Sequence, residues 1–217
     1  MKILNLYAGI GGNRKLWKDV DVTAVELNPK IAKIYQDFFP KDKMVVADAH
    51  QYLLEHFKEF DFIWSSPPCP SHSSFRAGFS IANGARIIYP DMKLYEEILL
   101  LKHFFRGKWC IENVRSYYVP LIKPRELQRH YFWSNFHISQ KNFKKDSIRL
   151  TGGKYNNDDK EDITQIKRLQ ERYGYKLNEY RLGQTETRTI LRNCVLPELG
   201  LHILKESQRD IQPELFR

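Results

Sequence analysis

Residues 4–13, LNLYAGIGGN, run from an apolar strand pattern directly into a turn with three glycines. Glycine in such a turn lets the backbone approach a ligand closely, as it does where nucleotides bind. A dinucleotide fingerprint would need another glycine where Arg14 stands, and the Gly-Lys-Ser/Thr of a phosphate loop is absent. The stretch therefore predicts the first strand and turn of an α/β domain, and a plain tight turn explains it as well as a nucleoside site does.

The rhythm of strand, turn and helix continues to residue 113, which predicts a parallel sheet with helices on both faces. We expect strands at residues 3–7, 22–26, 44–47, 61–64 and 108–112, and helices at 13–17, 29–38, 50–58 and 91–105. Further along, we expect a strand at 131–138, an amphipathic helix at 161–173 and apolar spacing over 187–205. A chain of 217 residues suits one domain with an elaboration.

Acidic residues follow the second and third expected strands. Glu26 ends the second strand and Asp48 follows the third. Either carboxylate alone is explained by a helix cap or a solvated strand end. Glycine, glutamate and aspartate at three neighbouring strand ends together favour one nucleoside-shaped pocket, because the acidic residue after the second strand is the one that holds a ribose diol in such folds.

Residues 64–73, WSSPPCPSHS, place Cys69 just past the end of another strand. Open α/β sheets carry their chemistry at that edge, and the prolines restrict the backbone around the thiol. A lone cysteine is nevertheless more often a small core residue. His72 lacks companion ligands at a suitable spacing, so we expect no metal site.

The strand at residues 108–112 ends in Glu112, and Asn113 and Val114 follow. A carboxylate so close to the core is costly unless it is paired or binds a substrate. A salt-bridged buried glutamate and a substrate-binding glutamate both fit this pattern.

Taken together, these runs resemble the DNA cytosine-5 methyltransferase family. Pro68-Cys69 is similar to the family's Pro-Cys nucleophile motif, and residues 112–114 match its Glu-Asn-Val motif. The resemblance implies a Rossmann-like, class I S-adenosylmethionine-dependent methyltransferase sheet with helices on both faces and a small recognition element. It also implies methyl transfer to C5 of a flipped cytosine through a covalent Cys69 adduct, of the kind found in DNA methylation and restriction-modification.

The resemblance assigns site residues as well. It implies Cys69, Glu112 and Arg129 as catalytic residues and S-adenosylmethionine as cofactor. The cofactor would be held by Tyr7, Ala8, Gly9, Gly11, Gly12, Glu26, Leu27, Asp48, Ala49, Pro67, Asn193 and Val195. Three departures from the pattern stand out: the Gln-x-Arg-x-Arg motif falls on residues 125–129 and keeps only its last arginine, Arg192 replaces the glycine before Asn193, and Pro70 replaces a glutamine.

The charge is uneven along the chain. The sequence has 35 Lys plus Arg against 26 Asp plus Glu, and residues 121–192 hold 16 of the basic and 9 of the acidic residues. Tyr155, Tyr173, Tyr175 and Tyr180 lie in the same stretch, which favours a polyanion whose bases stack on aromatic rings. We expect a catalytic domain at residues 1–138 and 187–210, a reduced target-recognition region at 139–186 and a flexible tail at 211–217.

Double-stranded DNA is the expected partner, and residues 71–85, with Ser73, Ser74 and Arg76 toward the phosphates, are the expected loop over a flipped base. An RNA (tRNA) cytosine-5 methyltransferase and a catalytically idle nucleic-acid-binding module stay open as alternatives. A zinc deaminase is excluded, because no histidine has glutamate two residues later.

Residues 212–216, QPELF, resemble peptides that bind the bacterial sliding clamp. No stretch approaches the ~18 apolar residues of a membrane span, and the sequence begins without a signal-peptide pattern. Three widely spaced cysteines fit a reducing compartment. We expect a cytoplasmic monomer of a bacterial or phage-infected cell, with no membrane partner.

Overall fold

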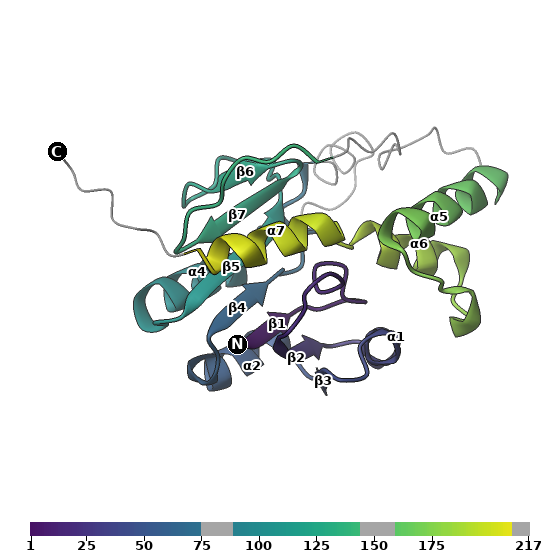
Figure 1. Ribbon diagram of the computed structural model, residues 1–217. Helices are drawn as coiled ribbons and strands as arrows, with labels where there is room; N and C mark the ends of the chain where they lie inside the picture. The colour runs from purple at the N-terminus through teal and green to yellow at the C-terminus, as the bar shows by residue number, and fades with distance from the viewer. Residues whose placement is uncertain (75–88, 144–158, 210–217) are drawn as a thin grey trace.

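Seven strands form one sheet in the order β3-β2-β1-β4-β5-β7-β6 (Figure 1). The computed structural model describes residues 1–74, 89–143 and 159–209. The strands are β1 (Lys2–Leu6), β2 (Asp21–Glu26), β3 (Lys43–Val46), β4 (Phe62–Ser65), β5 (Lys108–Val114), β6 (Arg125–Leu127) and β7 (His130–Ser134). The strands from β3 to β5 pair in parallel, whereas β7 pairs antiparallel with both β5 and β6. The expected Rossmann-like sheet is confirmed.

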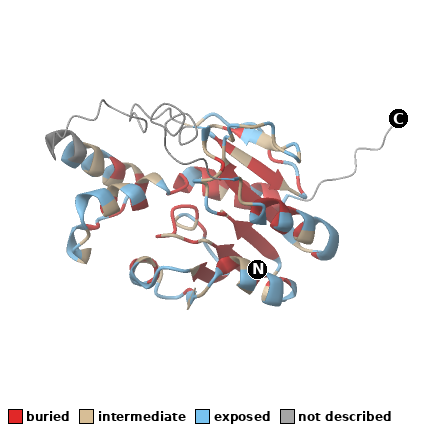
Figure 2. Ribbon diagram, turned by 180° about the vertical axis from the view of Figure 1, so that it is seen from behind, coloured by how far each residue is buried: buried red, intermediate tan, exposed pale blue. Residues whose placement is uncertain are grey.

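Helices cover both faces of the sheet because successive strand residues point to opposite sides. Phe62 and Trp64 of β4 join a hydrophobic cluster with residues of α1, α6 and α7, whereas Ile63 joins a cluster with α2 and α4. The buried residues accordingly concentrate in the central strands (Figure 2). The helices are α1 (Pro29–Phe38), α2 (Ala49–His56), α4 (Lys93–Phe104), α5 (Asp159–Tyr173), α6 (Gln184–Arg192) and α7 (Pro197–Ser207), with short 3-10 helices η1 (Phe57–Glu59) and η2 (Asn178–Tyr180).

The strand order reverses between β1 and β4. The chain proceeds from β1 to β2 and β3 on one side, and then crosses to β4 and β5 on the other. The loops that leave β1 and β4 therefore diverge, and an open α/β sheet binds ligands in the crevice between such loops. The glycine turn follows β1 and Cys69 follows β4, so the topology brings both stretches to this crevice.

The predicted helix at residues 13–17 is wrong. The backbone instead makes consecutive turns, in which the amides of Gly11, Arg14 and Trp17 each donate to the carbonyl three residues earlier, at 2.9, 3.1 and 3.0 Å. Asn13 is held by its side chain, whose Nδ2 donates to Oδ1 of Asn5 in β1 at 2.8 Å. This link to the strand favours a turn over a helix.

Two other predicted elements have different boundaries in the structure. The predicted strand at 131–138 ends at Ser134, where the Ser134 hydroxyl donates to the Phe136 carbonyl at 2.8 Å, and its partner β6 was not predicted. The apolar spacing over 187–205 belongs to two helices, α6 and α7. Pro197 opens α7, because proline cannot continue a preceding helix but suits the first turn of a new one.

The helix predicted at 161–173 is confirmed as α5, but the expectation that nearby tyrosines stack on bases is wrong for two of them. Tyr173 and Tyr175 are 2% and 1% exposed. The Tyr175 ring packs edge-on against Phe38 of α1, with centroids 4.8 Å apart, and Lys15 Nζ lies 3.7 Å from its centroid. Tyr173 and Tyr175 therefore attach the end of α5 to the rest of the domain.

Figure 1 shows α5 and α6 side by side at the end of the molecule away from β6. The division into catalytic and recognition parts stays a prediction. Tyr155, Arg76 with most of the expected 71–85 loop, and the 212–216 peptide lie outside the described residues. No helix within the described ranges has the length and apolar character needed to cross a membrane.

Helix α7 passes close to the glycine turn, which makes Gly200 a test of this packing. A Cβ at Gly200 would lie 2.2 Å from the carbonyl oxygen of Asn13. We expect Gly200→Ala to lower the free energy of unfolding by about 1–3 kcal/mol, measured by chemical denaturation. Gly183→Ala is the control, since a Cβ there meets nothing within 4 Å. Equal losses in both variants would contradict this packing.

Candidate active site

A pocket of about 970 Å³ opens at the carboxyl edge of the sheet. Its volume lies at the upper end of the ~300–1,000 Å³ usual for small-molecule sites. All residues expected in the site except Gly11 line it, namely Tyr7, Ala8, Gly9, Gly12, Glu26, Leu27, Asp48, Ala49, Pro67, Cys69, Glu112, Arg129, Asn193 and Val195. Gly11 instead shapes the turn from behind, with φ +83° and no room for a Cβ, which would lie 2.4 Å from the Phe39 ring.

Glu26 fastens the glycine turn to the end of β2. Its Oε2 accepts a hydrogen bond from the Gly9 amide at 3.0 Å, and its Oε1 accepts one from the Asn28 amide at 2.9 Å. Each carboxylate oxygen can accept a further hydrogen bond. The carboxylate is thus held in place by the backbone and can still receive hydroxyl groups from a ligand in the pocket.

Leu27 and Asp48 flank this carboxylate along the pocket. The Leu27 side chain is 66% exposed, which gives the pocket an apolar surface for a flat ring. Asp48 is the N-cap of α2 and accepts a hydrogen bond from the Gln51 amide at 3.0 Å. That hydrogen bond lowers the pKa of Asp48, so the side chain is an ionised acceptor at neutral pH. The helix-cap explanation of Asp48 is correct, and the residue also lines the pocket.

Cys69 is half-buried and sits at the start of a tight turn. Its carbonyl oxygen accepts hydrogen bonds from the amides of His72 and Ser73, both at 3.0 Å. On the other side, the Pro67 carbonyl accepts a hydrogen bond from Nδ2 of Asn113 at 3.0 Å. The backbone on both sides of the thiol is therefore fixed, and one of the anchors comes from the Glu-Asn-Val stretch.

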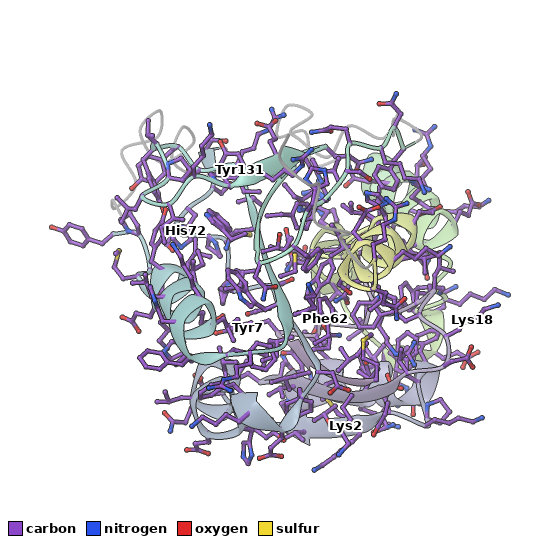
Figure 3. All side chains as sticks on the ribbon, turned by 60° about the vertical axis from the view of Figure 1, so that its left-hand side comes forward. Lys2, Tyr7, Lys18, Phe62, His72 and Tyr131 are labelled. Atoms are coloured by element: carbon purple, nitrogen blue, oxygen red, sulfur yellow. The ribbon has the colours of Figure 1, made fainter. Side chains whose placement is uncertain are left out.

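The turn after Cys69 is also held from residues 115–118. The Tyr117 amide donates to the His72 carbonyl at 3.1 Å, and Ser73 forms an isolated antiparallel bridge with Ser116. His72 is buried, with Nδ1 2.6 Å from the Tyr118 hydroxyl, and its burial lowers the pKa of its ring. Figure 3 shows His72 and Tyr7 on the same side of the molecule as α4. His72 is thus a structural part of the turn.

Glu112 lies near the end of β5, beside β4 in the sheet, and is 7% exposed. Its Oε1 is in close hydrogen-bond contact with Nδ1 of His130 in β7. The sequence allowed a salt-bridged buried glutamate or a substrate-binding one. Glu112 fits both interpretations, because it is paired with a histidine and also lines the pocket.

The family model for the C-5 cytosine-specific DNA methylases matches residues 1–116, just over half of the chain. The chain belongs to this family.

Among curated proteins, the chain is 35% identical over 75 residues to a tRNA (cytosine(38)-C(5))-methyltransferase of Spodoptera frugiperda. That match spans 31% of this chain and 23% of the relative.

Several solved structures share the fold of this chain. Entamoeba histolytica methyltransferase EhMeth aligns with a TM-score of 0.59 at 12% identity, over 95% of this chain and 97% of its own. A DNMT2 mutant of Spodoptera frugiperda aligns at 0.55 and 12% identity, over 96% and 99%. A putative DNA modification methyltransferase encoded within an Escherichia coli prophage aligns at 0.51 and 14% identity, over 95% and 98%. At such identities these likenesses show a common fold alone.

The residues of the pocket fit S-adenosylmethionine, the methyl donor that membership of this family implies. Glu26 offers acceptors for the two ribose hydroxyls, Leu27 offers an apolar face for adenine, and Asp48 offers an acceptor for the adenine amine. Glu26 ends β2, Leu27 follows it, and Asp48 follows the neighbouring strand β3, next to the glycine turn after β1. The pocket thus presents the groups that this nucleoside needs in one place.

Arg129 lies in the tight turn between β6 and β7, where Gln128 has φ +57°. Its Nε donates a hydrogen bond to Nε2 of His130 at 3.2 Å. Leu127 stands where the Gln-x-Arg-x-Arg motif has its first arginine. Its side chain is buried in the core and is 2% exposed. Arg129 therefore reaches the pocket, and a histidine beside it contacts Glu112.

A buried carboxylate next to the pocket was not predicted. Glu97 of α4 is fully buried. It accepts hydrogen bonds from the hydroxyls of Tyr7 at 2.7 Å and Ser65 at 2.6 Å, and its Oε1 lies 3.1 Å from Nδ1 of His50. These partners follow β1, end β4 and begin α2. Nothing in the sequence distinguishes Glu97 from the other residues of its helix, because its partners come together only in the folded sheet.

The far end of the 139–186 region also reaches the pocket, which no sequence pattern indicated. Gly183, Thr185 and Glu186 line it, as do Thr189 and Arg192 of α6. The last residues of the proposed recognition region, which form the start of α6, therefore line the pocket.

The His50 and Glu97 pair predicts a pH-dependent contribution to stability. The hydrogen bond to Glu97 raises the pKa of His50 above its ordinary value of 6.5. The folded state therefore binds this proton more tightly, so the stabilisation is complete below pH ~6.5 and is lost as the pH rises through the raised pKa. We expect the difference in free energy of unfolding between wild type and His50→Gln to shrink from about pH 6 to 9.

The control for this measurement is His103→Gln, because His103 is exposed at the end of α4. It should show a small difference at every pH. A difference between wild type and His50→Gln that stays constant across the range would contradict the pairing.

Proposed function

We propose that the protein methylates C5 of cytosine in double-stranded DNA, with Cys69 as nucleophile and S-adenosylmethionine as cofactor. The observation that carries this proposal is that Cys69 and Glu112 line the same pocket as Glu26, Leu27 and Asp48. A thiol, a carboxyl group and a nucleoside-type surface in one pocket are what this reaction requires.

The thiol solves the chemical problem of the reaction, which is that C5 of cytosine is a poor nucleophile. The Cys69 thiolate adds to C6, so an S–C6 bond forms and the electrons of the C5–C6 π bond make C5 nucleophilic. S-adenosylmethionine supplies the methyl group when it is bound. The C5 proton is then lost to a base, and the S–C6 bond breaks as the double bond reforms and the thiolate leaves.

Glu112 acts on the opposite edge of the cytosine ring. A proton that is held between its carboxyl group and N3 stabilises the negative charge that develops in the ring as the thiolate adds. The other hydrogen-bonding edge of the carboxyl can receive the exocyclic amine. Burial of Glu112 at 7% exposure strengthens these interactions, because electrostatic effects grow as water is excluded.

One feature favours DNA as the substrate, and a second favours a nucleic acid of either kind. The matching family model describes DNA methylases. Cytosine in a duplex must be flipped out to reach a buried thiol, and the basic residues of the recognition region suit the phosphates around such a site. Lys167, Arg168, Lys176 and Arg181 of that region are exposed.

A tRNA substrate is the second candidate. The observation in its favour is the 35% identity over 75 residues to a tRNA (cytosine(38)-C(5))-methyltransferase. The proposed chemistry at Cys69 and Glu112 would be the same for either nucleic acid, so the two candidates differ only in what is presented to the pocket.

Covalent trapping tests both the chemistry and the substrate. We expect a pool of duplexes that contain 5-fluorocytosine to form an adduct with the protein in the presence of S-adenosylmethionine, because fluorine at C5 cannot leave as a proton does. The adduct is measured as a shifted band on a denaturing gel. A 5-fluorocytosine tRNA pool should give far less adduct, and the reverse preference would favour the tRNA candidate.

Cysteine variants provide the controls for trapping. Cys69→Ala should abolish the adduct, whereas Cys110→Ala should retain it, because Cys110 is fully buried and its burial raises the pKa of its thiol. An adduct that persists in Cys69→Ala would refute the proposed nucleophile.

Cofactor binding tests the role of Glu26. We expect Glu26→Gln to weaken binding of S-adenosylmethionine about 10-fold to 100-fold, because hydrogen bonds to a charged group contribute about 1.5–3 kcal/mol. Isothermal titration calorimetry measures this change. Glu55→Gln on the exposed face of α2 is the control, and equal affinities in the two variants would contradict the assignment.

A further inference from the structure

His130 lies between Glu112, which the proposed reaction uses at the base, and Arg129, to which the family resemblance assigns a catalytic role. Its Nδ1 contacts Oε1 of Glu112, and its Nε2 accepts a hydrogen bond from Nε of Arg129 at 3.2 Å. The imidazole is 6% exposed and packs near the Phe132 ring, with centroids 6.2 Å apart. The ring is therefore held on both nitrogens and on one face.

These two contacts fix where the imidazole carries its proton. The Arg129 guanidinium group can only donate hydrogen bonds, so Nε2 of His130 must be the acceptor. A neutral imidazole with a lone pair on Nε2 carries its proton on Nδ1. That proton points to Glu112, so Oε1 of Glu112 is the acceptor in this contact.

The position of this proton constrains the glutamate. Because Oε1 accepts the hydrogen bond from His130, a proton on the Glu112 carboxyl belongs on Oε2. Glu112 lines the pocket and lies in β5, the strand beside β4, which leads to Cys69. Oε2, which is not engaged by His130, is thus the oxygen left to share a proton with N3 of a base in the pocket, and the second lone pair of Oε1 can still accept the exocyclic amine.

We propose that His130 is a positioning residue, which donates its Nδ1 proton to Oε1 of Glu112 and thereby turns Oε2 of that carboxyl group toward the target cytosine. This inference rests on the proposed function. His130 acts on the base only through Glu112 and takes no part in the chemistry at C5 and C6.

The local fold explains why a histidine takes this place. Leu127 occupies the motif position of an arginine, and its side chain is buried in the core, so no cation reaches Glu112 from there. Leu127 and His130 pair across the hairpin of β6 and β7, and His130 also pairs with Val114 of β5. The pairing brings the histidine to the glutamate, and the compact imidazole supplies the N–H donor.

Nuclear magnetic resonance tests the hydrogen-bond arrangement without any reaction. In protein labelled with 15N histidine, two-bond proton-nitrogen spectra distinguish the Nδ1–H from the Nε2–H tautomer. We expect His130 to be the Nδ1–H tautomer at neutral pH, with its signals assigned by their loss in His130→Asn. His137, which is exposed after β7, serves as the reference. An Nε2–H tautomer or a doubly protonated ring for His130 would overturn the proposal.

Variant kinetics test the consequence for the base. His130→Phe keeps a flat ring and removes the donor, and we expect kcat on duplex DNA to fall about 10-fold or more, with the Kd for S-adenosylmethionine unchanged. His130→Asn has an amide N–H close to the position of Nδ1 and should recover most of the rate. His137→Asn should match wild type.

The outcomes separate this inference from the proposed function. If wild type forms the covalent adduct but His130→Phe is as fast as wild type, the positioning role is wrong and the proposed function stands. If His130→Asn is as slow as His130→Phe, loss of the donor is not the cause, and the role is again wrong. If wild type forms no adduct on DNA or tRNA, the proposed function fails and the inference fails with it.

Discussion

The site depends on the burial of one carboxylate, that of Glu97. A charged group without water is costly unless hydrogen bonds and an opposite charge replace the lost hydration. Tyr7, Ser65 and His50 supply these partners, and each stands where a different part of the sheet reaches its carboxyl edge. A movement of the glycine turn relative to β4 would strip Glu97 of a partner, so the cofactor side and the cysteine side of the pocket are held in register.

A second buried carboxylate has a histidine partner at the part of the pocket where the base is proposed to bind. Glu112 is buried beside His130, as Glu97 is buried beside His50. In both pairs a ring nitrogen of histidine is in hydrogen-bond contact with the carboxylate and replaces part of the hydration that burial removes. The backbone anchors around Cys69 complete this arrangement, because Asn113 follows Glu112 and holds Pro67. The two residues assigned to the reaction are therefore positioned by one continuous stretch of β5.

The sequence predicted those parts of the site that follow from local patterns. Strand ends marked by Glu26, Asp48, Cys69 and Glu112 do line one pocket, because parallel strands bring their carboxyl ends to the same edge. Glu97 and His130 escaped prediction since their partners lie 90 and 18 residues away in the sequence. The helix at 13–17 failed for a similar reason, as the Asn13 side chain pairs with a strand residue that no local pattern reveals.

The buried tyrosines change the account of how a nucleic acid would be held. Because Tyr173 and Tyr175 lie in the core, they stabilise the attachment of α5 to the domain and cannot stack on bases. Under the proposed function, the exposed lysines and arginines of the region are left to contact phosphates, which gives affinity without sequence preference. Sequence preference would then involve Gly183, Thr185 and Glu186, which line the same pocket as Cys69 and Glu112.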